Sequence, residues 1–227
     1  MHESQARAYV SMNRDLFDPG QHSVESPALP PGVTLLAGFA LADAACLLED
    51  VAQMAEVSPP RRMQTPGGHW TSVSMSNCGE IGWVSDRRGY RYEAVDPLTE
   101  KPWPALPPSW LALAAQAAEH SGFPDFLPDA CLINHYAVGT RMGLHQDRDE
   151  RDFSAPIVSV SLGLPVTFQF GGASRRGPVV RIPLQHGDVI VWGGVARRHY
   201  HGVLTLKQGM HPATGDRRIN LTFRKAL

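Results

Sequence analysis

The chain has 227 residues, 43% of them hydrophobic, which is enough for one well-buried core and short for two full-sized domains. No stretch approaches the roughly 20 apolar residues that span a bilayer, and the first residues carry no basic-then-apolar signal pattern. The three cysteines are far apart and odd in number, so they suggest neither a disulfide framework nor a paired-cysteine metal site. No heptad repeat or long amphipathic helix argues for assembly. We therefore expect a soluble, cytoplasmic monomer that does not bind membranes.

The net charge of -1 hides an asymmetry along the chain. Residues 1–60 contain two Lys or Arg against eight Asp or Glu, whereas residues 171–227 contain ten against two, a local excess of eight positive charges. Such an excess suits a polyanion such as nucleic acid, or an acidic small molecule. Ordinary surface charge explains the same numbers, and composition alone does not decide between these interpretations.

The N-terminal half predicts an arm followed by two helices. Residues 1–32 end in SPALPPG and lack sustained periodicity, so we expect a flexible arm, within which Met12 offers an alternative start. After a strand in VTLLAGF, the run LADAACLLEDVAQMAEV places apolar residues at helical spacing. A second helix is predicted in SWLALAAQAAEH, with prolines at its entry and Gly122 as its stop. Both helices are expected to be packing elements.

The rest of the chain predicts β structure. Alternation from HWTSVSMSNCGEIGW to RGYRYEAVDP indicates a hairpin-rich insertion at about residues 61–105. From residue 130 onward, six short β-prone runs are separated by Gly, Pro and charged turns: ACLINHYA, IVSVSLGL, VTFQFGG, VVRIPL, DVIVWGG and RINLTFR. This density predicts a jelly roll, or double-stranded β-helix, over about residues 130–227. The expected fold is α+β, with one domain over residues 33–227.

A candidate metal site begins with His145 and Asp147 in GLHQDRDE. If that segment is extended, side chains two residues apart leave the same face and can meet one ion. A triad of two histidines and one carboxylate leaves three positions on non-haem Fe(II) open for O₂ and a bidentate co-substrate. The third ligand is expected in RRHYHGV, where spacing does not choose between His199 and His201, which point the same way if they share a strand. A surface histidine beside an acidic turn is the alternative.

The last strand-like run places four polar residues on one face: Arg218, Asn220, Thr222 and Arg224. A dicarboxylate co-substrate needs a permanently charged, bidentate partner, which arginine supplies better than lysine. Leu221 and Phe223 on the other face predict that the strand is half buried, and buried arginines favour anions. An exposed basic strand is the alternative.

Five motifs follow one another in the C-terminal half: NHYAVGTRMGLHQDRDE, APIVSVSLGLPVTFQFGG, HGDVIVWGG, YHGV and RRINLTFR. Three more lie upstream: MQTPGGHWTSVSMSNCGEIGW, RGYRYEAVDP and KPWPALP. In order and spacing these motifs resemble the bacterial AlkB family, iron(II)- and 2-oxoglutarate-dependent dioxygenases that repair alkylated DNA by direct reversal. The resemblance covers about residues 33–227 and leaves out only the arm.

The resemblance implies Fe(II) as cofactor, 2-oxoglutarate and O₂ as co-substrates, and methylated bases in single- or double-stranded DNA, or in RNA, as substrate. It selects His201 as the third metal ligand, because His201 is the histidine followed directly by Gly202. It implies that Arg218 and Arg224 clamp the far carboxylate of 2-oxoglutarate, and Arg224 joins the metal ligands as a catalytic residue. Other implied co-substrate contacts are Asn134, His135, Tyr136, Ile219, Asn220, Leu221, Thr222 and Phe223.

The resemblance also implies a mobile nucleotide-recognition lid. Its implied substrate residues are Trp83, Tyr90, Arg91 and Tyr92, with Asp149 and Arg175 near the damaged base and Trp192 on the inner wall of the core. An enzyme that acts on a base must extrude it, and Trp83 can replace the lost stacking, which is worth roughly 1–3 kcal/mol. A carboxylate at Asp149 favours a cationic N-alkylated adenine or cytosine over the neutral base. Without the resemblance, a packed Trp and a solvated acid are the plainer interpretations.

Some features bear on the strand and on substrate preference. Candidates for phosphate contacts are Arg175, Arg176, Arg197 and Arg198. Two positions depart from the family pattern: His69 stands where a tyrosine is expected, and Gly143 leaves more room beside the first ligand than a hydroxyl-bearing side chain. Both departures put substrate preference in question rather than the chemistry.

The implied reaction oxidatively decarboxylates 2-oxoglutarate to succinate and CO₂ and hydroxylates the N-methyl group of a flipped base such as 1-methyladenine or 3-methylcytosine. Formaldehyde is then lost and the base is restored. Two other functions stay open from the sequence alone. One is the same chemistry on methylated RNA or on a protein side chain, and the other is a non-catalytic jelly-roll module that binds modified nucleic acid.

Overall fold

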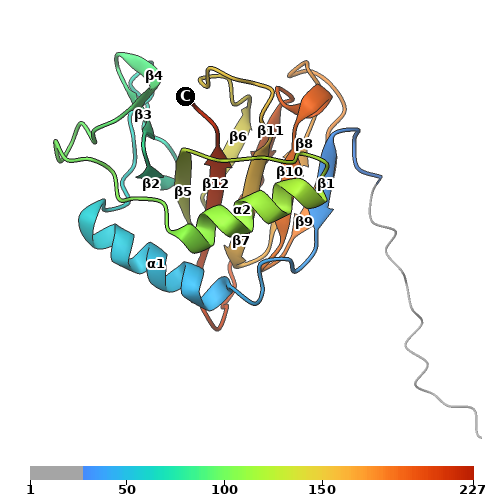
Figure 1. The fold of residues 1–227 in the computed structure, drawn as a ribbon, viewed down its shortest axis with the longest axis horizontal. Helices are drawn as coiled ribbons and strands as arrows, with labels where there is room; N and C mark the ends of the chain where they lie inside the picture. Colours follow the sequence, from blue (N-terminus) through green and yellow to red (C-terminus); the bar gives the residue numbers. More distant parts are fainter. Residues whose placement is uncertain (1–27) are drawn as a thin grey trace, which may run out of the picture.

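The computed structural model describes residues 28–227, so residues 1–27 of the expected arm, with Met12, lie outside the described residues. Two sheets face each other, two helices cover one of them, and a separate hairpin stands at one end (Figure 1). The helices are α1 (Ala44–Val57) and α2 (Pro108–His120), and a short 3₁₀ helix spans Gly194–Ala196. Within the described part of the chain, no helix is long and apolar enough to cross a membrane.

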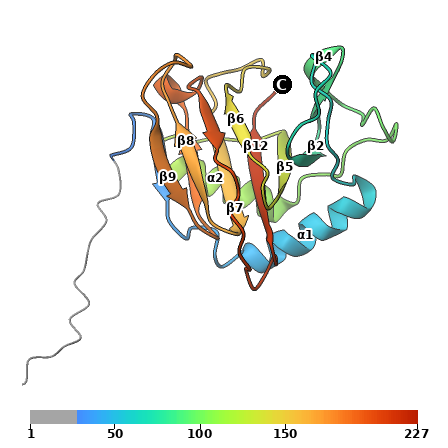
Figure 2. The same ribbon diagram turned by 180° about the vertical axis from the view of Figure 1, so that it is seen from behind.

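The larger sheet has the strand order β1-β10-β7-β12-β5-β2, with every neighbouring pair antiparallel. Its strands are β1 (Val33–Leu36), β2 (Ser74–Gly79), β5 (Ala130–Ala137), β7 (Ile157–Gly163), β10 (Val189–Trp192) and β12 (Arg217–Arg224). The smaller sheet, of order β6-β11-β8-β9, lies on the side away from the helices (Figure 2). Its strands are β6 (Met142–His145), β8 (Val166–Phe170), β9 (Val180–Leu184) and β11 (His201–Val203). These opposed sheets confirm the predicted jelly roll.

Both predicted helices are confirmed, and both pack on the larger sheet. In α1, the apolar residues at helical spacing, Leu47, Val51 and Met54, are buried on one face. The helix α2 begins at prolines and stops at Gly122, whose φ of +83° is a left-handed conformation that glycine adopts without strain. The helices therefore support the larger sheet and leave its other face to the smaller sheet.

The alternation of side chains along β7 separates two cores. Val158, Val160 and Leu162 belong to the core between the larger sheet and the helices. Ser159 and Ser161, one residue out of phase, point to the space between the two sheets, where they bond to side chains of β12. The larger sheet is thus apolar on its helix side and partly polar on its inner side.

The expected lid is a two-stranded hairpin of β3 (Gly82–Asp86) and β4 (Gly89–Glu93), in which Trp83 pairs with Tyr92. The predicted bounds of about 61–105 also take in β2, which is the edge strand of the larger sheet and pairs with β5. Alternation in the sequence indicates an extended strand but does not identify the strand with which it pairs. Two strands of the core, β6 and β11, were not among the six predicted runs. They have four and three residues, too few to show alternation.

Candidate metal centre and co-substrate site

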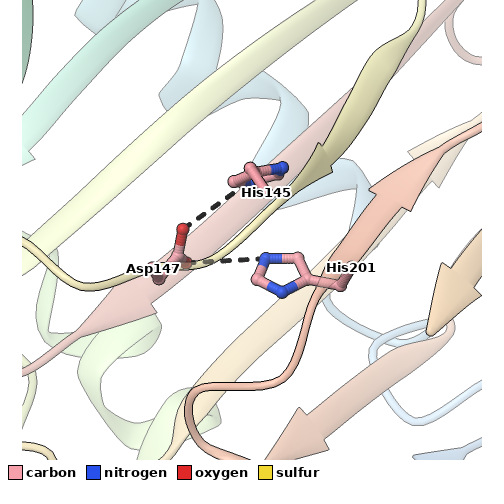
Figure 3. A group of neighbouring side chains, drawn as sticks. All are labelled: His145, Asp147 and His201. Carbon is pink, nitrogen blue, oxygen red and sulfur yellow. Dashed lines mark ion pairs between the residues drawn. The ribbon is translucent and has the colours of Figure 1, made fainter. Parts of the chain in front are cut away.

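The three predicted metal ligands converge where β6 ends and β11 begins (Figure 3). His145 is the last residue of β6, His201 is the first of β11, and the two are antiparallel partners across the smaller sheet. Asp147 lies two residues beyond the end of β6, so the segment need not stay extended to bring the carboxylate to the site. One ligand atom from each residue lies within 4.8 Å of the others, the one such group within residues 28–227.

The ligand atoms of this triad face one another. Asp147 Oδ1 lies 3.5 Å from His145 Nε2, and Asp147 Oδ2 lies 3.8 Å from His201 Nε2. The two imidazole rings have centroids 4.5 Å apart. Two imidazole nitrogens and a carboxylate on one side of a common point are the donor set of the non-haem Fe(II) facial triad, so the residues present fit the metal.

Backbone carbonyls orient both imidazole rings. The Nδ1 of His145 lies 2.9 Å from the carbonyl oxygen of Gly143, and the Nδ1 of His201 lies 3.0 Å from that of His199. A proton on Nδ1 satisfies each carbonyl and leaves the Nε2 lone pair free for a metal. Burial, reinforced by nearby His145, lowers the pKa of His201 to about 3, so this ring is neutral at pH 7.

The Asp147 carboxylate is held ionised by an arginine. Arg224 donates from Nε and Nη2 to Asp147 Oδ2 at 2.9 and 2.7 Å. Burial acts to raise the pKa of Asp147, but Arg224 and the two histidines outweigh it, and the pKa lies below its usual range. A buried, permanently negative ligand suits a divalent cation.

His199 does not share the strand of His201, so the expectation that both histidines point the same way is wrong. The strand β11 starts at His201, and His199 lies in a turn, where its N–H donates to the carbonyl of Ala196. His199 supports the site through its own carbonyl, which orients the His201 ring. Its side chain is not part of the metal-ligand group.

Arg218 is a buried cation suited to a carboxylate. Its side chain is 1% exposed, its Nη2 donates to Ser161 Oγ at 3.0 Å, and its guanidinium lies 4.9 Å over the ring of Tyr136. Its Nε and Nη1 have no hydrogen-bond partner among the described residues. Burial lowers the pKa of Arg218, which is the sign of a charge held away from water. Because a buried unpaired charge is costly, these two donors fit the far carboxylate of 2-oxoglutarate.

A network of amides and hydroxyls lies between Arg218 and Arg224. Asn220 donates to Ser159 Oγ at 2.8 Å and to the carbonyl of Val160 at 2.9 Å. Its Oδ1 accepts from Asn134 at 3.2 Å and from Thr222 at 2.9 Å. These bonds fix Asn134, whose own Oδ1 is buried without a partner. The network confirms that Asn134, Asn220 and Thr222 lie together on the inner face.

Arg224 does not share the role of Arg218. Six residues along a strand separate their backbones by about 20 Å, so the expectation that both clamp one carboxylate is wrong. Arg224 bonds to Asp147 and lies 3.4 Å from Glu150 Oε1. Arg224 positions a metal ligand, and of these two arginines only Arg218 has donors without a partner, which suit the far carboxylate.

Four predicted co-substrate contacts have side chains on the other face of the sheet. Ile219, Leu221 and Phe223 pack in the core beneath the helices. His135 is the cross-strand partner of Ile219 and shares its face. Alternation places every second residue of β5 and β12 away from the site, so these side chains cannot contact the co-substrate.

The lid and the metal site border one cavity of about 440 Å³. Its walls include Trp83, Tyr90, His145, Asp147, Asp149 and Arg175. Trp83 stacks on Tyr90 with ring centroids 5.6 Å apart, and its Nε1 donates to Asp149 Oδ2 at 2.8 Å. The cavity therefore has an aromatic wall, a carboxylate and two of the three metal ligands, His145 and Asp147, within one space.

Two other predicted residues, Arg91 and Arg197, lie elsewhere or act differently, whereas Trp192 lies near the metal site. Arg91 is on the opposite face of the hairpin from Trp83, where it pairs with Asp86 and Glu93 instead of lining the cavity. Arg197 was expected to contact a phosphate, but it is only 2% exposed and cannot do so. Trp192 is buried as expected, with its ring centroid 4.8 Å from that of His201.

Sequence reasoning missed Glu150, which links the hairpin of β3 and β4 to Arg224 beside the metal site. Its carboxylate is buried, accepts from Tyr92 Oη at 2.8 Å and pairs with Arg197 Nη2 at 3.3 Å as well as with Arg224. Arg197 also donates to the carbonyl of Asp147 at 3.1 Å. In the acidic turn DRDERD nothing distinguishes this acid from its solvated neighbours, because its three partners come from distant segments.

Comparison with known proteins agrees with this geometry. The model of the 2OG-Fe(II) oxygenase superfamily matches residues 32–224. The alpha-ketoglutarate-dependent dioxygenases AlkB of Salmonella typhimurium and Escherichia coli are 56% and 55% identical over 198 residues, covering 87% of this chain and 92% of each relative. The solved structure of OsALKBH1 superposes with a TM-score of 0.77 at 27% identity, covering 88% of this chain and 99% of that structure.

These matches and the converging triad lead to one assignment. The match spans both sheets and the lid, and the relatives are covered over nearly their full length. The buried donors of Arg218 and the His-Asp-His triad supply the two sites that such a dioxygenase requires. The chain therefore belongs to the 2OG-Fe(II) oxygenase superfamily and, within it, to the AlkB dioxygenases, enzymes that depend on iron(II), 2-oxoglutarate and O₂.

Proposed function

We propose that this chain oxidatively demethylates N-alkylated bases, of the 1-methyladenine and 3-methylcytosine type, in DNA or RNA. The observation that carries the proposal is the single cavity lined by Trp83 and Asp149 together with the metal ligands His145 and Asp147. An extruded base needs an aromatic surface, and Trp83 offers one that is held in place by its bond to Asp149. The same carboxylate favours a base that alkylation has made cationic. This is direct-reversal repair, because the base itself is restored.

The residues divide the work as follows. His145, Asp147 and His201 would hold Fe(II), and Arg218 would hold the far carboxylate of 2-oxoglutarate. Together with O₂, these groups supply the oxidation that turns an N-methyl into an N-hydroxymethyl group, with succinate and CO₂ as co-products, and formaldehyde then leaves. Arg224 keeps Asp147 ionised and in place. The hairpin of β3 and β4 contributes Trp83 and Tyr90 to the cavity wall, where it would cover the base and exclude water.

We further propose that the protein acts as a monomer in the cytoplasm. Its three cysteines are free, although Cys78 and Cys131 are cross-strand partners and both are buried. Free neighbouring thiols suit a reducing compartment. Size-exclusion chromatography with light scattering tests the monomer, and a mass of twice the chain would contradict it.

The test is a panel of oligonucleotides, single- and double-stranded, in DNA and RNA, each carrying one 1-methyladenine or 3-methylcytosine. Iron-loaded protein should release formaldehyde from these substrates and not from N-methylated peptides. Trp83→Ala should raise KM by roughly 5- to 150-fold, the value of a lost base stack, and Trp83→Phe should recover most of it. Both variants should bind iron normally. Turnover of the peptides alone would overturn the nucleic-acid assignment.

A further inference from the structure

The segment between α1 and β2 carries an aromatic side chain that the proposed reaction does not use. Trp70 is 59% exposed, the most exposed aromatic residue within residues 28–227. The indole is a large apolar surface, and burying it is favourable, so its exposure on a stable turn suggests that a partner covers it during function. Tyr90, the next most exposed aromatic at 48%, already lines the cavity.

Trp70 is next in the chain to a wall residue of the substrate cavity, although Trp70 itself is not one of the wall residues. Its neighbour Thr71 lines that cavity, and so does Thr65 at the other end of the turn. The turn is tied to the lid, because Ser85 Oγ of β3 donates to the carbonyl of Gln64 at 2.8 Å. Trp70 therefore lies outside the space that an extruded base would enter and one residue along the chain from its wall, where a neighbouring nucleotide would pass.

The turn that presents Trp70 is held by its own hydrogen bonds. The N–H of Thr65 donates to the carbonyl of His69 at 2.7 Å, and the N–H of Gly68 donates to the carbonyl of Thr65 at 2.8 Å. Gln64 Nε2 donates to the carbonyl of Gly68 at 3.0 Å, and Gly68 has a φ of +83°, which glycine supplies without strain. A surface fixed in advance loses little entropy when it binds.

Two arginines are bonded to the residues that follow Trp70 in the chain. Arg62 Nε donates to the carbonyl of Thr71, which places its guanidinium beside the cavity edge. Arg141 is exposed, and its N–H donates to Ser72 Oγ at 3.1 Å. Neither arginine forms an ion pair within the described part of the chain, so both are available to phosphate. An aromatic surface with cations beside it is the usual recognition surface for single-stranded nucleic acid.

We propose that Trp70 stacks on the nucleotide next to the extruded base, with Arg62 and Arg141 beside the phosphates. This rests on the proposed function and adds a second binding position to it. In a duplex the neighbouring base is already stacked on its own strand and paired, whereas in a single strand its face is free. Trp70 therefore favours single-stranded substrates. His69, which stands where the family pattern has a tyrosine, belongs to the same turn.

The experiment compares two single-stranded DNA pentamers with 3-methylcytosine at the centre. One has ordinary bases on both sides, and the other has abasic nucleotides there. Trp70→Ala should raise KM about 10-fold on the first pentamer and leave KM on the second unchanged, because only the first offers a base to stack on. Trp70→Phe should retain most of the effect, and kcat should be the same for all three proteins. Leu127→Ala, 69% exposed and outside the cavity walls, is the control.

Direct binding separates this inference from the proposed function. Fluorescence anisotropy of the same labelled pentamers reports affinity whether or not demethylation occurs. Equal affinity of Trp70→Ala and wild type for the first pentamer, or an equal loss on both pentamers, overturns the role of Trp70 and leaves demethylation untouched. Failure of the iron-loaded wild type to release formaldehyde from either pentamer overturns the proposed function, and the anisotropy comparison still decides on Trp70.

Discussion

The two faces of β12 belong to one strand but hold different parts of the molecule. On the helix side, Ile219, Leu221 and Phe223 pack against an apolar core. On the inner side the alternate residues are polar and buried: Arg218, Asn220, Thr222 and Arg224. Buried polar groups add little to stability even when they are well paired, whereas buried apolar groups supply most of it. We infer that the helix side stabilises the fold and that the inner side carries the chemistry.

Loss of a metal ligand should have the largest effect on activity, and loss of His145 should have little effect on stability. His145→Ala should reduce demethylation to background, because two remaining ligands hold iron poorly, while the half-exposed His145 adds little to the fold. Asp147→Asn should lose activity in the same way, since the amide cannot replace the negative charge, but it should also lower the thermal midpoint, because it deprives the buried Arg224 of its main ionic partner. Iron content per protein and the thermal midpoint check both statements. Turnover within tenfold of wild type in either variant would contradict the metal assignment.

Phe223→Ala should show the reverse pattern, with a large loss of stability and no change in co-substrate binding. Phe223 is fully buried and packs edge-on against Trp110, with ring centroids 6.0 Å apart. Its truncation should lower the free energy of unfolding by about 3–5 kcal/mol, the usual range for an aromatic core residue. At a temperature where the variant is still folded, KM for 2-oxoglutarate should be unchanged. A raised KM would mean that the two faces are not separable.

Arg218→Met tests the inner face of β12, where a substitution should impair co-substrate binding and leave stability intact. Removing a charge-assisted contact worth about 1.5–3 kcal/mol should raise KM for 2-oxoglutarate by roughly 10- to 150-fold. Because the guanidinium is buried without a carboxylate partner in the described protein, the apolar variant should be as stable as wild type or more stable. Chemical denaturation measures this without the co-substrate. A large loss of stability would show that Arg218 is structural.

The smallest effect is expected at His135, on the helix side of the sheet. Burial, with a contribution from Arg217, lowers the pKa of His135 to about 4. As the pH falls through 6.5, His135 takes up a proton in the unfolded chain but not in the folded chain. The free energy of unfolding is therefore undiminished above pH 6.5 and falls as the pH drops towards 4. The part due to His135 should be on the order of 1 kcal/mol. His135→Leu should flatten the pH dependence in that window, and an unchanged slope would contradict it.

The sequence predicted most of the fold because the necessary information is local. The alternation in RINLTFR and the spacing in LADAACLLEDVAQMAEV are complete within one element, and both were confirmed. The triad was predicted as a set, although spacing alone left His199 open. What decides against His199 is the start of β11 two residues later, and a three-residue strand has no pattern to detect.

The rest of the site depends on contacts between distant segments. Glu150 is bonded from the lid by Tyr92 and from the last strand by Arg224, and no spacing in the sequence relates these residues. Arg197 lies among basic residues that suggested a phosphate contact, yet its burial beside Glu150 makes it structural. The residue type indicated the charge of Glu150 and of Arg197, but only the fold shows which side chains pair with them.

The most direct test of the central claim measures succinate and formaldehyde together. Wild-type protein with Fe(II), 2-oxoglutarate, O₂ and a 3-methylcytosine oligonucleotide should form both products in a one-to-one ratio, and Asp147→Asn should form neither. The unmethylated oligonucleotide should yield no formaldehyde. Succinate formed at the same rate with and without the methyl group, with no formaldehyde in either case, would contradict a demethylase and leave only the uncoupled oxygenase.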